Sequence, residues 1–137
     1  MELKLSICNL LVRDQDEALA FYHGTLGLDV RSDVRFGDIR WLTVGPASQP
    51  EIEITLETPA MGHWPADDVE AITALMDRHV INTLIFRTDD CQASYETLRA
   101  AGARVIQEPT DQPYGVRDCA FRDPSGNQVR FSQPLAG

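Results

Sequence analysis

The sequence repeats one pattern of short elements, with an offset of about 76 residues between the two copies. Val-Arg-Asp at 12–14 precedes a helix-like segment in the first copy, and Thr-Asp-Asp at 88–90 precedes one in the second. Such a repeat in a chain of 137 residues indicates an internal duplication. Each copy alone offers little sheet and one helix, so we expect the two copies to share a core within a single domain, 1–137.

The first copy is expected to fold as a strand, a helix and three further strands. A carboxylate at Asp14 or Asp16 caps the helix, and Gly24 or Gly27 ends it. The strands are expected at 3–12, 29–36, 38–44 and 51–57. Side chains alternate in the last strand, which gives it one packed face and one face that is wet or lines a site. The packed face carries Ile52, Ile54 and Leu56, and the other face carries Glu53, Thr55 and Glu57.

The second copy follows the same order. Asp89 or Asp90 caps its helix and Gly102 stops it. Its strands are expected at 82–88, 104–108, 117–122 and 128–133. The duplication therefore predicts a module 1 at about 1–58 and a module 2 at about 81–134. A linker loop and helix at about 59–80 join them, with Asp67 or Asp68 as the helix cap and His79 on the apolar, partly buried stripe of the helix.

Six short motifs identify this repeated arrangement. They are Leu-Val-Arg-Asp at 11–14, Ala-Phe-Tyr at 20–22, Leu-Gly-Leu at 26–28, Thr-Asp-Asp at 88–90, Tyr-Glu-Thr-Leu-Arg-Ala-Ala-Gly at 95–102 and Phe-Arg-Asp-Pro-Ser-Gly-Asn at 121–127. In this order they resemble the vicinal-oxygen-chelate superfamily of glyoxalase I, the extradiol dioxygenases and the bleomycin-resistance proteins. The resemblance implies an α+β fold, in which two βαβββ modules form an open, cup-shaped mixed sheet with helices on the convex side. It also implies a homodimer.

The resemblance implies four metal-ligand positions, one in the first strand and one in the last strand of each module. In this sequence they hold Ile7, Glu53, Thr83 and Arg130. Isoleucine has no donor atom, and a guanidinium stays protonated and repels a cation. We therefore predict neither a metal nor another cofactor. Glu53 and Arg130 fall at equivalent positions of the two modules, where they either form an ion pair or face solvent or a ligand separately.

A ligand-binding site is expected in the cup, and its candidate residues are Asn9, Trp41, Glu53, Arg87, Tyr114 and Arg130. Trp41 either stacks on a ligand or is a core residue. Tyr114 either contacts a ligand at the rim or packs within its turn. Arg130, with Arg87 on the same face, suits the carboxylate or phosphate of an anionic ligand. His63, in the linker loop, fits a rim or dimer contact better than a ligand contact.

Charge and apolar content limit the partners. Acidic residues outnumber basic ones by 21 to 12, and the net charge of −9 repels a phosphate backbone, so we expect no nucleic-acid partner. The N-terminus lacks a signal-peptide pattern, and no apolar run is long enough to cross a bilayer. We therefore expect a cytoplasmic protein with no membrane partner. The three cysteines are far apart and are expected to be reduced and structural.

Two classes of function remain open. The leading hypothesis is a metal-free protein of the glyoxalase and bleomycin-resistance type that binds a small molecule in the cup between the modules. Net acidity favours a cationic ligand, whereas Arg87 and Arg130 favour an anionic group. The alternative is an enzyme: a metal-dependent lyase or dioxygenase with non-standard ligands, or a metal-free reaction with Glu53 as base. A dimeric scaffold with a closed pocket is a third hypothesis.

Overall fold

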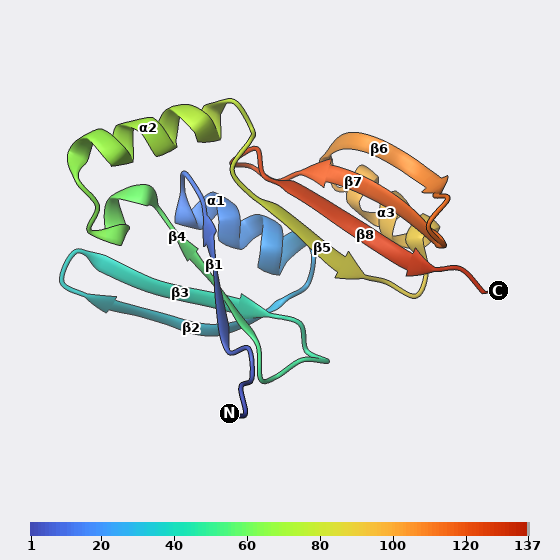
Figure 1. Ribbon diagram of the computed structural model, residues 1–137, viewed down its shortest axis with the longest axis horizontal. Helices are drawn as coiled ribbons and strands as arrows, with labels where there is room; N and C mark the ends of the chain where they lie inside the picture. Colours follow the sequence, from blue (N-terminus) through green and yellow to red (C-terminus); the bar gives the residue numbers. More distant parts are fainter. Residues whose placement is uncertain (137) are drawn as a thin grey trace. The chain divides into compact units, whose positions relative to one another are not determined.

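The structure is a computed structural model that describes residues 1–136. The chain divides into two compact units, a first from Met1 to Leu75 and a second that starts at Met76. Each unit contains one four-stranded sheet, and the two sheets have the same strand order (Figure 1). Within the described residues, no helix is long and apolar enough to cross a membrane.

Unit 1 holds the expected strand, helix and three strands. Its elements are β1 (Ile7–Leu11), α1 (Gln15–Leu19), the π-helical segment η1 (Ala20–Thr25), β2 (Asp29–Phe36), β3 (Ile39–Gly45), β4 (Glu53–Glu57) and the 3-10 turn η2 (Pro59–Gly62). The sheet order is β1-β4-β3-β2, with β1 and β4 parallel and the other neighbours antiparallel. This sheet is called sheet 1.

The first strand is shorter than predicted. β1 starts at Ile7, whereas the strand was expected from residue 3, and Leu3 is exposed. Its partner β4 begins only at Glu53, because the chain turns just before it through a hydrogen bond from Ile52 N to Gln49 O of 3.1 Å. Residues ahead of Ser6 therefore have no strand of sheet 1 to pair with.

The helix of unit 1 begins where a carboxylate meets its free amide groups. Asp14 Oδ1 accepts a hydrogen bond of 2.9 Å from the backbone N–H of Glu17, which selects Asp14 over Asp16 as the cap. The helical segment ends before Gly27, which has φ 75°. One face of sheet 1 packs with this segment. The buried residues on the two sides are Leu10, Leu42, Val44, Ile54 and Leu56 from the strands and Ala18, Phe21 and Tyr22 from the helical segment.

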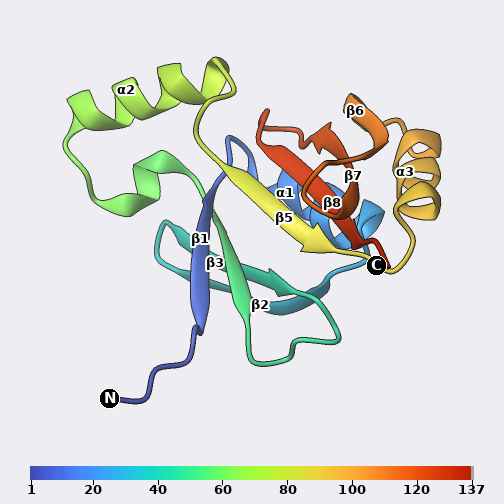
Figure 2. The same cartoon turned by 45° about the vertical axis from the view of Figure 1, so that its right-hand side comes forward.

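Unit 2 repeats this design. Its elements are β5 (Thr83–Arg87), α3 (Cys91–Ala100), β6 (Arg104–Asp111), β7 (Val116–Arg122) and β8 (Gln128–Pro134), and the order of this sheet, sheet 2, is β5-β8-β7-β6. Asp90 caps α3 by accepting a hydrogen bond of 3.0 Å from Ala93 N. α3 contacts β6, β7 and β8 and covers one face of sheet 2 (Figure 2). Two copies of βαβββ, as predicted, are therefore present.

The covered face of sheet 2 forms the core of unit 2. Its buried side chains include Tyr95, Leu98, Phe121, Val129 and Phe131. Cys91 and Cys119 are buried free thiols of the same core. Burial, followed by the neighbouring Cys91 thiol, raises the pKa of Cys119 to about 12. A thiol of that kind stays protonated and unreactive at neutral pH, as expected of a structural cysteine.

The linker helix α2 (Ala66–Asp77) begins before both predicted caps, and Asp67 and Asp68 lie in its first turn. The placement of His79 on the buried stripe of this helix is wrong. His79 lies beyond the helix end, has φ 62° and is exposed. Its imidazole ring lies against Gly126, so that a Cβ at position 126 would overlap the ring. Gly126 also has φ 88°, a backbone conformation that favours glycine whatever space a side chain would have.

Candidate functional site

Each sheet has a second face, which points away from its own helix and is called here the distal face. On sheet 1 the strand register places Asn9 opposite Thr55, and Thr43 opposite Thr55 on the other side. Because side chains alternate along a strand, Glu53, Glu57 and Trp41 share this face. The distal face of sheet 1 is therefore defined by Ile7, Asn9, Trp41, Thr43, Glu53, Thr55 and Glu57.

Polar side chains of this face bond to one another. Thr43 Oγ1 donates to Glu53 Oε1 at 2.7 Å, and Thr55 Oγ1 donates to Asn9 Oδ1 at 2.5 Å. Both threonines are buried. Glu53 and Asn9, two of the predicted ligand-binding residues, are therefore held in place by neighbours on adjacent strands.

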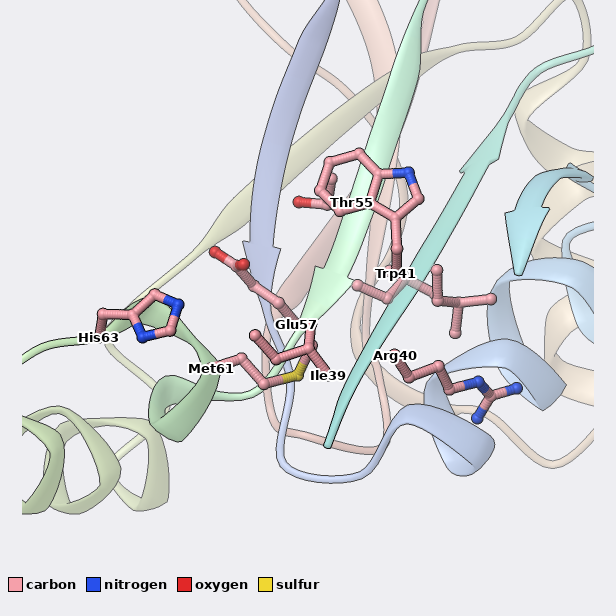
Figure 3. A pocket seen from close by; sticks show the side chains of 9 residues that line it. Ile39, Arg40, Trp41, Thr55, Glu57, Met61 and His63 are labelled. Carbon is pink, nitrogen blue, oxygen red and sulfur yellow. The ribbon is translucent and has the colours of Figure 1, made fainter. Parts of the chain in front are cut away.

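A hollow lies at one end of the distal face of sheet 1. It has a volume of about 180 Å³, and its lining includes Trp41, Glu57, Met61 and His63. Glu57 extends from β4 between the indole of Trp41 and the ring of His63 (Figure 3). Complete sites for drug-sized ligands measure roughly 300–1,000 Å³, so this hollow fits one ring or one end of such a ligand.

Glu57 is the charged group best placed to meet a ligand in the hollow. Its carboxylate is half-buried, and the structure records no hydrogen bond or ion pair to it from residues 1–136. Burial raises the pKa of Glu57 above its ordinary value, because desolvation disfavours the charged form. A cation or a hydrogen-bond donor that enters the hollow relieves that penalty.

The distal face of sheet 2 carries arginines, whereas that of sheet 1 carries carboxylates. Register places Arg87 opposite Ser132, Arg122 opposite Gln128, and Arg130 two residues before Ser132 on β8. All three arginines therefore share the distal face. This face is defined by Thr83, Ile85, Arg87, Gln107, Asp118, Ala120, Arg122, Gln128, Arg130 and Ser132.

A buried network holds Arg130. Its Nη2 donates to Gln107 Oε1 at 2.6 Å and lies 3.4 Å from Asp118 Oδ2. Asp118 is 4% exposed, and its Oδ1 accepts hydrogen bonds from Gln107 Nε2 at 2.8 Å and Gln112 Nε2 at 2.9 Å. Burial pushes the pKa of Asp118 upward, but hydrogen bonds from Gln112 and Gln107 and the charge of Arg130 together hold it below its ordinary value. Asp118 is therefore an ionised counter-charge to Arg130.

The strand register corrects the predicted equivalence of Glu53 and Arg130. Glu53 lies directly opposite Ile7, the first-strand position of unit 1. Opposite Thr83, the first-strand position of unit 2, lies Gln128, and Arg130 comes two residues further along β8. The two charged residues share the same kind of face but differ in depth along the strand. Comparing motifs between the copies could not detect this shift, because it preserves the alternation of faces.

The ion pair recorded for Arg130 is with Asp118, a residue that the sequence analysis missed. Glu53 instead accepts from Thr43. A pair between Glu53 and Arg130 would join the two units, and it stays a prediction. Polar alternation in 116–122 was the available signal for Asp118, since Asp118 and Arg122 fall on one face of that segment.

The remaining predicted residues lie where a ligand could reach them. Trp41 is partly exposed and lines the hollow, and its stacking on a ligand stays a prediction. Arg87 is exposed on β5. Tyr114 is 68% exposed, and its hydroxyl lies 3.4 Å from Asp118 Oδ2. Glu57 and Met61 were not predicted, although Glu57 shares the alternating face of Glu53.

The residues at the metal positions do not fit a divalent metal. Glu53 is the one anionic donor among them, Ile7 and Arg130 offer no lone pair, and Thr83 and Gln128 are weak neutral donors. Across the part of the chain that the structure describes, no group of three or more His, Cys, Asp or Glu residues could hold a metal ion. We therefore derive no chemical step through a metal.

The duplicated βαβββ units define the class of protein. The chain matches the model of the Glyoxalase/Bleomycin resistance protein/Dioxygenase superfamily over residues 4–131 and belongs to this superfamily.

Individual relatives agree with this assignment. YurT of Bacillus subtilis (strain 168) is 32% identical over 136 residues, which cover 96% of this chain and 99% of YurT. UcmS2, known from a crystal structure, is 36% identical in sequence with a TM-score of 0.89, and the match covers 96% of this chain and 98% of UcmS2. TnmS3, described as an antibiotic binding protein from Streptomyces sp. CB03234, is 28% identical with a TM-score of 0.74, and the match covers 97% of both chains.

Proposed function

We propose that this protein binds a small organic molecule without a metal, at a site that includes the hollow of sheet 1. The observation that carries the proposal is the hollow itself, where a partly exposed indole lies beside the half-buried carboxylate of Glu57. An aromatic face with an adjacent carboxylate suits a flat ligand that bears a cationic or hydrogen-bond-donating group. The residues at the metal positions and the similarity to TnmS3, an antibiotic binding protein, support the same proposal.

Binding can be followed by the fluorescence of Trp41. The chain has two tryptophans, so Trp64→Phe leaves Trp41 as the single reporter. We expect 9-aminoacridine, a planar aromatic cation, to quench this fluorescence along a saturable curve. Glu57→Gln in the same background should weaken the apparent affinity by about tenfold, since it removes the charge next to the bound cation. Quenching that is linear in probe concentration, or unchanged by Glu57→Gln, would count against the hollow as the site.

The enzyme alternative is separated from this proposal by metal content. The protein purified without chelator should carry no stoichiometric Zn, Ni, Mn or Fe, as measured by elemental analysis after dialysis. About one metal ion per chain that survives dialysis would favour the metal-dependent lyase or dioxygenase with non-standard ligands.

We further propose that the protein acts as a homodimer, as is usual in its superfamily. Each sheet ends in unpaired edge strands, which commonly pair with or pack against a second copy. Light scattering should give about twice the chain mass of 15.3 kDa at micromolar concentration. A stable species of the single-chain mass would refute the dimer and leave the binding proposal standing.

A further inference from the structure

The distal face of sheet 2 concentrates positive charge in an acidic protein. It carries Arg87, Arg122 and Arg130 on three neighbouring strands, and Asp118 is the carboxylate that defines it with them. The chain as a whole has a net charge of −9. Charges further away than about 8 Å are largely screened at physiological salt, so this local excess determines what binds here.

In the part of the chain that the structure describes, Arg87 and Arg122 have no recorded ion pair with a carboxylate. Within residues 1–136 the structure records no hydrogen bond or ion pair to Arg87. Arg122 Nη1 donates to the backbone oxygen of Gly126 at 3.2 Å, which is the side-chain hydrogen bond that the structure records for it. Arg117 of the same unit, by contrast, pairs with Asp111 at 2.6 Å.

Arg130 differs from the other two because its position is fixed. Gln107 and the buried Asp118 hold Nη2, and the side chain is only 20% exposed. Nη1 has a long contact of 3.4 Å with Gln128 Oε1, so this edge of the guanidinium keeps donors for another acceptor. A guanidinium already held in one orientation loses little entropy when it binds a ligand.

Register brings Arg87 within reach of the same acceptor. Arg87 lies opposite Ser132, and Arg130 lies two residues before Ser132 on the adjacent parallel strand. Neighbouring strands are about 4.8 Å apart and two residues span about 6.6 Å, so the Cβ atoms of the two arginines are separated by about 8 Å. Two arginine side chains reach across that distance to opposite sides of one carboxylate or phosphate.

We propose that the distal face of sheet 2 binds an oxyanion, a carboxylate or a phosphate group, between Arg87 and Arg130, with Asp118 as the residue that positions Arg130. This inference rests on the proposed function, namely that the protein binds a small organic molecule. It deepens that proposal by assigning an anionic group to a ligand bound on unit 2. It needs neither the hollow of sheet 1 nor a particular arrangement of the two units. Its failure is therefore distinct from failure of the hollow or of the metal prediction.

The experiment is a titration followed by the Nε–Hε signals of the arginines in ¹⁵N NMR spectra, at constant ionic strength set with chloride. The probes are inorganic phosphate in one arm and benzoate in the other. We expect saturable shifts of Arg87 and Arg130 in at least one arm, with a millimolar Kd. A lower Kd for phosphate identifies a phosphate group as the natural partner. A lower Kd for benzoate identifies a carboxylate on an organic ligand.

Variants decide whether the pair of arginines is responsible. Arg87→Gln and Arg130→Gln should each weaken binding by about tenfold, which is 1.4 kcal/mol. Arg130→Lys keeps the charge but loses the planar fork, and should lose most of the affinity as well. Arg99→Gln is the matched control. Arg99 is an exposed arginine of α3 in the same unit, and its substitution removes the same charge.

Two results would overturn the inference. One is the absence of saturation by either probe beyond the effect of chloride. The other is an equal loss of affinity in Arg99→Gln and Arg87→Gln, which would mean general electrostatic attraction. Arg87 is exposed and has no recorded partner, so Arg87→Gln should fold and keeps the test decisive even if Arg130→Gln is destabilised.

Discussion

The two distal faces have the same strand order but opposite charge. On sheet 1 the face carries Glu53 and Glu57 beside an indole, and Arg40 of β3 lies on the other side with Asp16 and Asp33. On sheet 2 the corresponding face carries arginines and a single buried carboxylate, Asp118, at other positions along the strands. Duplication thus preserved the backbone while side chains diverged, and the binding chemistry has to be derived for each half separately.

The largest expected difference between the faces is in stability. Asp118→Ala should lower the free energy of unfolding by about 2–4 kcal/mol, because it leaves the half-buried Arg130 and two glutamine amides without their acceptor. Glu53→Ala should lower the free energy of unfolding by about 1 kcal/mol, since it leaves the neutral hydroxyl of Thr43 without its acceptor at a half-buried position. Urea unfolding of both variants measures the difference. Equal losses would show that the two faces do not differ in how far their charges are desolvated.

Asp111→Ala is the control for the Asp118 result. Asp111 pairs with Arg117 in the same unit, but the two side chains are 56% and 40% exposed, so the variant should change stability far less than Asp118→Ala does. The contribution of Asp118 to stability depends on pH, and the direction of this dependence follows from its lowered pKa. Its ionised form stabilises the fold above the unfolded-state pKa, and this contribution is lost as the pH falls through the lower folded-state pKa.

The second prediction concerns the pH dependence of binding on sheet 1. The cationic probe 9-aminoacridine should bind the ionised form of Glu57, whose pKa lies above the ordinary 4.5. Affinity should therefore rise by about tenfold as the pH increases through that raised value and then level off. Fluorescence titrations of the Trp64→Phe protein across this range measure the midpoint. Glu57→Gln should flatten the profile, and a profile that survives this change would assign the titration to another group.

The third prediction compares two partners for Arg130. A double-mutant cycle between Asp118 and Arg130, using Asp118→Asn and Arg130→Gln, should give a coupling free energy of about 1 kcal/mol or more. The corresponding cycle between Glu53→Gln and Arg130→Gln should give a smaller value, because Asp118 already neutralises Arg130 within its own sheet. If the Glu53 cycle gave the larger coupling, the ion pair predicted from the duplicated sequence would be the principal one.

The smallest expected effect is on sheet 1. Thr43→Val keeps the shape of a fully buried side chain and removes the hydroxyl that donates to Glu53 at 2.7 Å. The loss should be about 0.5–1.5 kcal/mol, because water can still reach the half-buried carboxylate. Thermal unfolding of Thr43→Val and Thr43→Ser separates the hydrogen bond from the packing of the methyl group. A neutral Thr43→Val would mean that Glu53 is supported by solvent alone.

Most of the fold could be predicted because the local signals agree with one another. Asp14 and Asp90 both act as helix caps, the alternation in 51–57 assigned the faces of β4, and the duplication fixed the order of elements. The errors lie where a contact distant in sequence decides. β1 starts late because β4 does, and His79 leaves its helix to lie against a turn near position 126.

The candidate site was predictable only in part. Face alternation places Trp41, Glu53 and Arg130 on the distal faces, and the strands obey it. It does not give the register between strands, which separates Arg130 from the position equivalent to Glu53. Nor does it show that Asp118 is buried with Arg130, or that the turn after β4 brings His63 to Glu57, because each depends on contacts between segments that only the folded chain brings together.

The contact between His79 and Gly126 has a consequence for dividing the molecule. The predicted second module begins at about 81, yet the imidazole that covers the buried Gly126 belongs to residue 79. A fragment cut at 81 would lose the ring that lies against this turn, whereas one cut at 76 would keep it. The start of the predicted second repeat and the start of the second compact unit at Met76 are therefore a few residues apart.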